Sequence, residues 1–300
     1  MQKIKCPLCN SNKEEFLFNV GKWGKNYRAV KCNSCGFVFI NPQPSKEEIE
    51  EHYNKNYDYS YMFKRKLSKN DLKDVKSIKK IKKGRLLDVG CGTGLFILAA
   101  KKNGLNVFGI DLSEKVVEYG KNKFNLDLKN KDFLKQKGKF DLITMRYLLE
   151  HTTDPRKYIK KTSKLLDGGG LLFLKLPNIN SFSSKLCKEY WEWMSPPAHL
   201  MFFSPKKISK LLFEEGFKIL KIETRRGDAG SLFLNFLVTF SKKMNFARKL
   251  RKRSNNIKKN KNLSSLVKIA NFLNFFLFPL EYILNKRGKG PEMVVYAIKK

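Results

Sequence analysis

Two closely spaced pairs of cysteines near the amino terminus could bind a metal ion. The pairs have the spacing C-x-x-C and hold four of the six cysteines of the chain: Cys6, Cys9, Cys32 and Cys35. Four thiolates at tetrahedral angles form a structural zinc site, and one C-x-x-C turn supplies two of them. Asn10 and Gly36 follow the pairs, and both residue types tolerate the positive φ that folds the backbone over a metal. We therefore expect a zinc ribbon, with a redox or disulfide pair as the less favoured alternative.

A glycine-rich turn further along the chain could bind a small ligand. Residues 85–89 form a short apolar run typical of a strand, glycines recur at 90, 92 and 94, and a helix-like run begins at Leu95. This order brings the backbone close to a ligand, but its G-x-G-x-G spacing differs from the G-x-G-x-x-G of a dinucleotide site. Asp88 places a negative charge directly before the turn. That charge disfavours a phosphate and favours a ligand that carries an amine or a sulfonium.

Two more carboxylates follow the next two strand-like runs. The run 106–110 ends in Asp111, where a carboxylate can accept hydrogen bonds from both hydroxyls of a ribose. Asp132 follows a short third strand expected near Leu126–Leu128, where it can reach an adenine amino group. Together with the glycine turn, these positions favour a ligand that contains a nucleoside.

Alternating strands and helices must position these residues. Further strand-like runs lie at 140–145, 171–176, 217–223 and 293–298, and two short strands are expected between the cysteine pairs, at 16–20 and 27–32. Ser45 and Glu48 have the spacing of a capping box that begins a helix. Residues 64–83, with ten basic side chains, predict a solvated helix. A hydrophobic content of 42% is enough for a core and excludes a chain that is disordered throughout.

The motifs resemble, in order, those of class I S-adenosylmethionine-dependent methyltransferases. The resemblance covers residues 82–225 and rests on DVGCGTG, GIDLS, KDF, FDLITMRYLLEH and LLDGGGLLFLKLPN. It implies an α/β, Rossmann-like sheet of seven strands, the last one antiparallel. It also implies that the following residues surround the cofactor: Asp88, Gly90, Cys91, Gly92, Gly94, Asp111, Leu112, Asp132, Phe133 and Arg146. A nucleotide-binding fold of another kind is the alternative.

The segment CNSCGFVFINPQPSKEEIEEHY resembles the zinc-binding head of bacterial and archaeal methyltransferases that act on small molecules and surface sugars. We therefore expect a zinc ribbon over 1–44, a helical linker over 45–81, a cofactor domain over 82–223 and 293–300, and a basic, apolar helical insertion over 224–292. Removal of zinc is expected to disorder the ribbon and to leave the cofactor domain largely folded.

Two of the three histidines are candidate catalytic residues. Methyl transfer from a sulfonium requires alignment, and a base only where the acceptor must lose a proton. His151 follows the fourth strand, on the acceptor side of such folds, and His199 lies in a segment, HLMFFS, that resembles the acceptor side of the same relatives. A structural role is the alternative for both, and His52 is expected to be exposed. Three nearby aromatic residues could cover the acceptor or pack in the core: Tyr190, Trp191 and Trp193.

The net charge of +35 suggests an anionic partner, such as nucleic acid, a membrane surface or an acidic substrate. However, 51 of the 62 basic residues are Lys and only 11 are Arg, the residue that recognises phosphates with a fixed fork. Residues 242–262 contain ten Lys or Arg and no acid, between apolar stretches at 232–240 and 263–284. This pattern predicts either weak attachment to an anionic membrane surface or a helical cap with a solvated loop.

The amino terminus has no apolar run typical of a secretory signal, and no uninterrupted apolar stretch reaches the roughly 18 residues of a membrane span. We expect a cytoplasmic enzyme, peripheral at the inner membrane face where the insertion attaches. It would methylate a small-molecule or glycan-linked acceptor, in surface polysaccharide or sugar metabolism, with S-adenosylmethionine and Zn²⁺ bound. An RNA methyltransferase is the alternative, disfavoured by the low Arg content; a silent binding module is a third, disfavoured by the intact glycine turn and Asp111.

Overall fold

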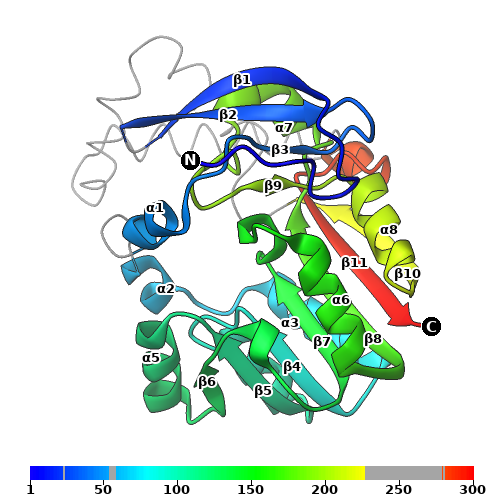
Figure 1. Ribbon diagram of the computed structural model, residues 1–300. Coiled ribbons are helices and arrows are strands. Elements are labelled where there is room, and N and C mark those ends of the chain that lie inside the picture. Colours follow the sequence, from blue (N-terminus) through cyan, green and yellow to red (C-terminus); the bar gives the residue numbers. More distant parts are fainter. Residues whose placement is uncertain (23, 54–58, 227–278, 280) are drawn as a thin grey trace.

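The computed structural model describes residues 1–22, 24–53, 59–226, 279 and 281–300, and Figure 1 shows their arrangement. Most of the expected insertion, including the basic run 242–262, lies outside the described residues. The prediction of a cap or a membrane-attaching segment there stays a prediction.

A seven-stranded sheet forms the lower part of the molecule in Figure 1. Its strands are β4 (Arg85–Val89), β5 (Asn106–Asp111), β6 (Leu128–Asn130), β7 (Phe140–Arg146), β8 (Leu166–Pro177), β10 (Phe217–Arg225) and β11 (Glu292–Lys299). They lie in the order β10-β11-β8-β7-β4-β5-β6. The neighbours from β8 to β6 are parallel, whereas β11 is antiparallel to both β8 and β10. The expected α/β, Rossmann-like sheet with a reversed last strand is confirmed.

Helices cover both faces of this sheet because each buries an apolar side. The longer ones are α3 (Lys69–Ile81), α4 (Leu95–Lys102), α5 (Glu114–Phe124), α6 (Pro155–Leu165) and α8 (Pro205–Glu214). The shorter ones are α1 (Lys46–Glu51), α2 (Ser60–Lys64) and α7 (Phe182–Cys187), with single 3-10 turns at Phe133–Lys135, Leu149–His151 and Lys188–Tyr190. Val75, Phe96 and Val117 of α3, α4 and α5 share one core, and Ile159 and Leu211 of α6 and α8 share the other.

Helix α3 differs from the solvated helix that its basic residues predicted. It buries Val75 and also Asp74, whose carboxylate pairs with Arg225 and lies 3.7 Å from the Lys175 ammonium. Lys175 is itself fully buried and lies 3.2 Å from a carboxylate oxygen of Glu292. Because buried charges require partners, these ion pairs tie α3 to β8, β10 and β11.

A second, four-stranded sheet forms the amino-terminal head. The hairpin of β1 (Glu14–Lys22) and β2 (Lys25–Cys32) contains both strands expected between the cysteine pairs, and β3 (Val38–Ile40) follows. The fourth strand, β9 (Met201–Phe202), comes from much later in the chain and pairs with β3. The expected capping box at Ser45 and Glu48 begins α1 beside this sheet.

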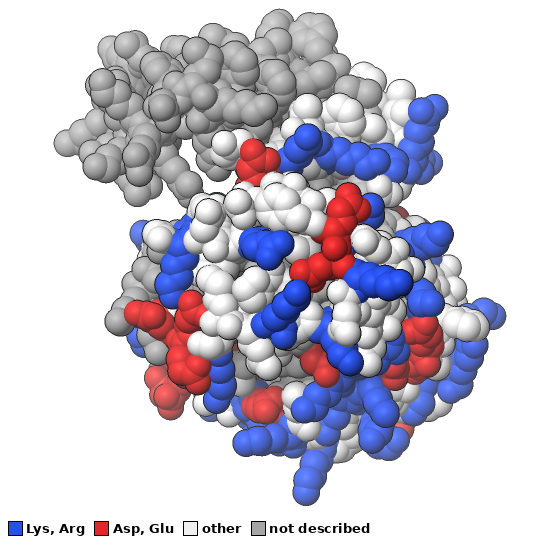
Figure 2. All heavy atoms as spheres, turned by 45° about the horizontal axis from the view of Figure 1, so that its top comes forward, with Lys and Arg blue, Asp and Glu red and all other residues white. Residues whose placement is uncertain are grey.

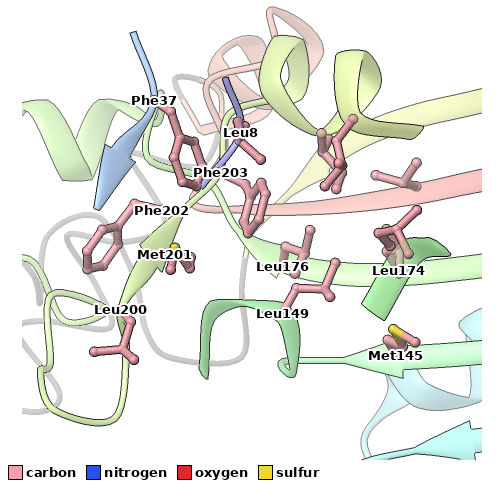
Figure 3. Close-up of a cluster of buried hydrophobic side chains, with 14 of the residues drawn as sticks. Leu8, Phe37, Met145, Leu149, Leu174, Leu176, Leu200, Met201, Phe202 and Phe203 are labelled. Carbon is pink, nitrogen blue, oxygen red and sulfur yellow. The ribbon is translucent and has the colours of Figure 1, made fainter. Parts of the chain in front are cut away.

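One continuous hydrophobic core joins the head to the large sheet. Figure 3 shows Leu8 and Phe37 of the head close to Phe203, with Leu176 of β8 and Leu149 of the turn after β7 below them. The rings of Phe37 and Phe203 lie 5.1 Å apart, centroid to centroid. The two sheets therefore share buried side chains rather than meeting through a solvated linker.

Polar contacts hold both cysteine turns onto the same body. Arg156 of α6 donates a hydrogen bond to the Leu8 carbonyl at 2.8 Å, and it also pairs with Glu214 and Glu215 at the end of α8. Lys207 of α8 donates to the Cys35 carbonyl. Each cysteine pair is thus anchored by a cation from the helices that cover the large sheet.

The basic residues are spread over the surface in view. Figure 2 shows Lys and Arg side chains interspersed with Asp and Glu, and they do not gather over one element of this face. Among the helices within the described ranges, none combines the length and the apolar character needed to cross a membrane.

Candidate active site

The glycine turn lies between β4 and α4, at the carboxyl end of the parallel strands. Backbone N–H groups of Gly90 and Cys91 donate to the Ile110 carbonyl at 2.8 and 3.1 Å, which fixes the turn against β5. Gly94 caps α4 with φ of +79°, and a Cβ there would lie 2.8 Å from the Leu126 side chain. Only glycine therefore fits at this position without a shift of its neighbours.

Asp111 lies at the tip of β5 and faces this turn. Its two carboxylate oxygens accept hydrogen bonds from the Gly92 N–H at 2.8 Å and the Ser113 N–H at 2.9 Å. Burial raises the pKa of Asp111, and these N–H donors oppose the rise. The structure thus brings together the turn and the carboxylate that the sequence assigned to the cofactor. Leu112, the next residue, is 70% exposed.

Asp88 is buried at the end of β4, where its carboxylate accepts a hydrogen bond from the Thr144 hydroxyl at 2.6 Å. Burial raises the pKa of Asp88 to about 6, against the opposing effect of the Arg146 guanidinium. Arg146 itself pairs with Asp71 of α3 and lies 4.1 Å from the centre of the Phe96 ring. The structure therefore engages Arg146 in an ion pair beneath the turn, a role that the sequence did not indicate.

Asp132 and Phe133 lie beyond β6, on the same edge of the sheet as Asp111. The Asp132 carboxylate caps the 3-10 turn by accepting from the Leu134 N–H at 2.8 Å. Phe133 is buried, and its ring packs 5.5 Å from that of Tyr158. Phe133 thus belongs to the core that supports this edge.

Helix α2 covers the glycine turn, which the sequence did not predict. A Cβ at Gly92 would lie 2.7 Å from the Met62 methyl group, so α2 lies directly against the turn. The Phe63 ring lies 4.5 Å from the Tyr119 ring of α5, and the Tyr119 hydroxyl donates to the Phe63 carbonyl at 3.1 Å. We call the glycine turn 90–94 and the strand ends that carry Asp111 and Asp132 the cofactor edge. Helix α2, which precedes the sheet in the sequence, covers this edge.

His151 and His199 meet at the carboxyl end of β7. Their rings lie 4.6 Å apart, edge to face, although the residues come from separate segments. The Nδ1 of His199 lies 2.7 Å from the Trp193 carbonyl, so this nitrogen carries the proton and Nε2 carries the lone pair. The Nδ1 of His151 lies 3.1 Å from the Tyr53 hydroxyl. The structure thus brings both predicted candidates together.

Both imidazoles are held neutral. Burial lowers the pKa of His199 to about 4 and that of His151 well below its usual range, where the neighbouring His199 lowers it further. His52 is 6% exposed, so the expectation of an exposed residue was wrong. It packs beside Tyr53, at 5.6 Å between ring centres.

Glu150 completes the cluster, and sequence reasoning missed it. Its carboxyl group is buried, neither oxygen has a hydrogen-bond partner among the described residues, and burial raises its pKa to about 8. Glu150, His151 and His199 each place a ligand atom within 4.8 Å of the other two. A carboxylate next to a histidine, directly after a strand, was the signal available in the sequence.

Aromatic rings line the same region. Tyr147, at φ of +53°, stacks on Trp193 at 5.2 Å, and Trp193 stacks on His199 at 5.7 Å. The Tyr147 hydroxyl donates to the buried Glu292 carboxylate. Trp191, in contrast, is 1% exposed and packs near Phe202, so its role is in the core.

The four amino-terminal cysteines converge in the head. The Sγ atoms of Cys6 and Cys35 lie 3.6 Å apart, those of Cys9 and Cys32 lie 3.5 Å apart, and all four lie within 4.8 Å of one another. Sulfur atoms around a tetrahedral zinc ion, at about 2.3 Å each, lie about 3.8 Å apart. The spacing therefore fits a zinc ion. Cys91 and Cys187 lie outside this cluster.

Comparisons with known proteins agree with this architecture. Residues 59–222 match the family model described as a methyltransferase domain. A ubiquinone biosynthesis O-methyltransferase of Coxiella burnetii is 37% identical over 108 residues, which cover 33% of this chain and 46% of the relative. A protein of the same name from Pelagibacter ubique is 36% identical over 124 residues, covering 38% and 52%. The chain thus spans about half the length of these relatives.

Two solved structures share the fold. A methyltransferase from Thermotoga maritima, dependent on S-adenosylmethionine, superposes with a TM-score of 0.53 at 17% identity, covering 84% of this chain and 99% of its own. The magnesium protoporphyrin IX methyltransferase of Synechocystis with bound S-adenosylhomocysteine gives 0.52 at 14% identity, covering 85% and 100%. At these identities the likeness concerns the fold alone.

Proposed function

The chain belongs to the class I S-adenosylmethionine-dependent methyltransferases, and on that premise we propose that it methylates an oxygen atom of a small-molecule acceptor. The observation that carries the proposal is the pair of neutral, half-buried imidazoles of His151 and His199 next to the cofactor edge. A hydroxyl acceptor must lose a proton, and a neutral imidazole can take it. The ubiquinone biosynthesis O-methyltransferases, which match 33% and 38% of the chain, support the same chemistry.

The cofactor edge offers groups that match S-adenosylmethionine. The glycine turn would lie under the methionyl part, Asp111 would accept from the ribose hydroxyls, and Asp132 would lie near the adenine. Asp88 would supply negative charge near the sulfonium. When bound, S-adenosylmethionine supplies an electrophilic methyl carbon, and the electrons of its carbon–sulfur bond stay on sulfur.

His199 is the better placed of the two bases. Its Nδ1–H donates to the Trp193 carbonyl, so the tautomer that leaves Nε2 free to accept a proton is fixed. As the acceptor oxygen forms its bond to carbon, its proton passes to this nitrogen. Tyr147 and Trp193 exclude water beside it and offer flat apolar surface to the acceptor.

Two classes of hydroxyl fit this proposal. The aromatic surface and the relatives named for ubiquinone biosynthesis favour a phenol. The likeness of the head to that of sugar-modifying enzymes favours a sugar hydroxyl, free or carried on a lipid. RNA is disfavoured by the low Arg content, since only 11 of the 62 basic residues are Arg.

The head would carry one Zn²⁺ ion. Its ligands would be the sulfur atoms of Cys6, Cys9, Cys32 and Cys35, whose mutual distances support tetrahedral coordination. The ion would have a structural role, because four thiolates leave no open position.

The test is methyl transfer from radiolabelled S-adenosylmethionine to panels of phenols and sugar nucleotides. His199→Asn keeps a side-chain N–H for the Trp193 carbonyl but removes the base, and it should lower kcat by about 10²–10⁴-fold while cofactor affinity stays unchanged. His52→Gln alters a buried histidine outside the pair and should retain activity. A fully active His199→Asn enzyme would contradict the assignment of the base.

A further inference from the structure

Glu150, His151 and His199 form a second group of potential metal ligands, remote from the cysteines. Glu150 and His151 are consecutive in the 3-10 turn after β7, and His199 precedes β9. The Leu200 N–H donates to the Glu150 carbonyl at 2.7 Å, which holds the two segments together. One donor atom from each residue lies within 4.8 Å of the other two.

The Glu150 carboxyl group has no counter-charge among the described residues. It is 1% exposed, neither oxygen has a hydrogen-bond partner, and no ion pair reaches it in the part of the chain that the structure describes. The charged group that acts on it is Glu292, which has the same sign. A buried carboxylate without partners is strongly disfavoured. The Glu150 carboxylate therefore requires either a bound cation or a proton to neutralise its charge.

The two imidazoles are oriented as metal ligands are. In metal sites the second ring nitrogen of a ligating histidine contacts a carbonyl, a carboxylate or another polar group, which fixes the ring. The Trp193 carbonyl does this for His199 and the Tyr53 hydroxyl for His151, through Nδ1 in both cases. The Nε2 atom of His199 is thereby left for a ligand. The Ala198 carbonyl also contacts the His151 ring, and this contact would give way on binding.

We propose that Glu150, His151 and His199 bind a divalent first-row transition metal ion at the acceptor side of the site. Two imidazoles and one carboxylate favour such an ion over Mg²⁺ or Ca²⁺, which prefer oxygen ligands throughout. Three protein ligands leave coordination positions open, as in catalytic rather than structural metal sites.

The role of the ion rests on the proposed function. An acceptor hydroxyl bound at an open position would lose its proton to water more readily, because the cation stabilises the oxygen anion. The lone pair of His199 would then hold the ion instead of taking the proton. The oxygen anion attacks the methyl carbon, and the carbon–sulfur bond breaks with its electrons on sulfur.

The experiment is a titration of the full chain with Co²⁺, after the cysteine cluster has been loaded with Zn²⁺ and free metal removed. We expect one Co²⁺ per chain, with the weak visible bands of nitrogen and oxygen ligands. Thiolate-to-cobalt charge transfer, which would report Co²⁺ in the head, should be absent. Glu150→Gln removes the anionic ligand at constant size and should weaken Co²⁺ binding at least tenfold, and His199→Asn should do the same.

His52→Gln is the matched control, since it changes a buried histidine outside the cluster, and it should bind Co²⁺ as the unaltered protein does. Circular dichroism and thermal unfolding establish that each variant is folded. Absence of saturable Co²⁺ uptake, or equal affinity in both ligand variants, would overturn the metal site. Methyl transfer that persists without added metal would overturn its role while leaving the proposed function intact. Metal binding without methyl transfer to any acceptor would instead count against the proposed function.

Discussion

The cofactor edge and the acceptor side lie next to each other but are built in different ways. The cofactor edge comes from consecutive units, β4, the glycine turn, α4 and β5, and its main contacts join residues about twenty positions apart, such as Gly92 and Asp111. The acceptor side is assembled from four separate segments that contribute Tyr53, Tyr147, His199 and Glu292. The first can form as soon as its strands pair, whereas the second requires the whole fold.

The head belongs to the acceptor side. Strand β3 pairs with β9, and the Ile40 N–H donates to the Leu200 carbonyl at 2.9 Å, one residue after His199. The cysteine cluster lies outside the site, but it supports the acceptor side through the backbone of β3 and β9.

Loss of the cysteine cluster should separate the two regions most strongly. Cys32→Ser should abolish stoichiometric zinc binding and lower methyl transfer by more than about 100-fold, because β3 no longer holds β9. Affinity for S-adenosylhomocysteine, measured by calorimetry, should change less than about threefold, because the cofactor strands lie in the other sheet.

Cys187→Ala is the control for this prediction, since it removes a buried thiol outside the cluster and should leave zinc content and activity unchanged. Equal loss of cofactor binding and activity in Cys32→Ser would show that the two regions fold as one unit.

Asp111→Ala alters the cofactor edge itself, whereas Cys32→Ser alters the head. It removes the acceptor of the Gly92 and Ser113 N–H bonds and of the expected ribose contacts. S-adenosylmethionine binding should weaken by about 2–3 kcal/mol, the scale of hydrogen bonds to a charged group. Leu112→Ala, at the exposed neighbouring residue, should cost less than about 1 kcal/mol of binding free energy. Unchanged affinity in a folded Asp111→Ala protein would reject the ribose assignment.

The smallest effect concerns charge at Asp88, whose pKa of about 6 lies above its unfolded value. The neutral carboxyl stabilises the folded state at low pH, and this stability is lost as the pH rises through 6. Ionised Asp88 attracts a sulfonium, so affinity for S-adenosylmethionine should rise up to about tenfold between pH 5 and 7. S-adenosylhomocysteine, which lacks the sulfonium charge, should show no such rise. In Asp88→Asn both ligands should bind with the same pH dependence. If the affinity of this variant for S-adenosylmethionine still rises between pH 5 and 7, a group other than Asp88 causes the rise.

The same contrast explains what the sequence could predict. The cofactor edge follows from local signals, because the glycine spacing and the carboxylate at a strand end determine their own surroundings. The acceptor side depends on contacts between segments that lie far apart in the sequence. The proximity of Glu150 to His199 and the burial of His52 therefore could not be predicted from any short stretch of residues. The contact of Met62 with Gly92 was hidden for the same reason, because the five residues of α2 give no sign of the distant turn against which they pack. The burial of Asp74 was hidden because α3 carries mostly polar or charged residues and looks solvated in isolation.

Strand β11 lies between β8 and β10, yet it is synthesised after both. A nascent chain that has already emerged up to β10 therefore presents two strand edges that cannot pair with each other in the native order. Glu292, the first residue of β11, also receives the Tyr147 hydroxyl and lies 3.2 Å from Lys175. Until translation reaches Glu292, the ammonium of Lys175 and the hydroxyl of Tyr147 lack this partner. The acceptor side is thus completed late in biosynthesis, and chains interrupted before residue 292 would keep the glycine turn and Asp111 without a working acceptor side.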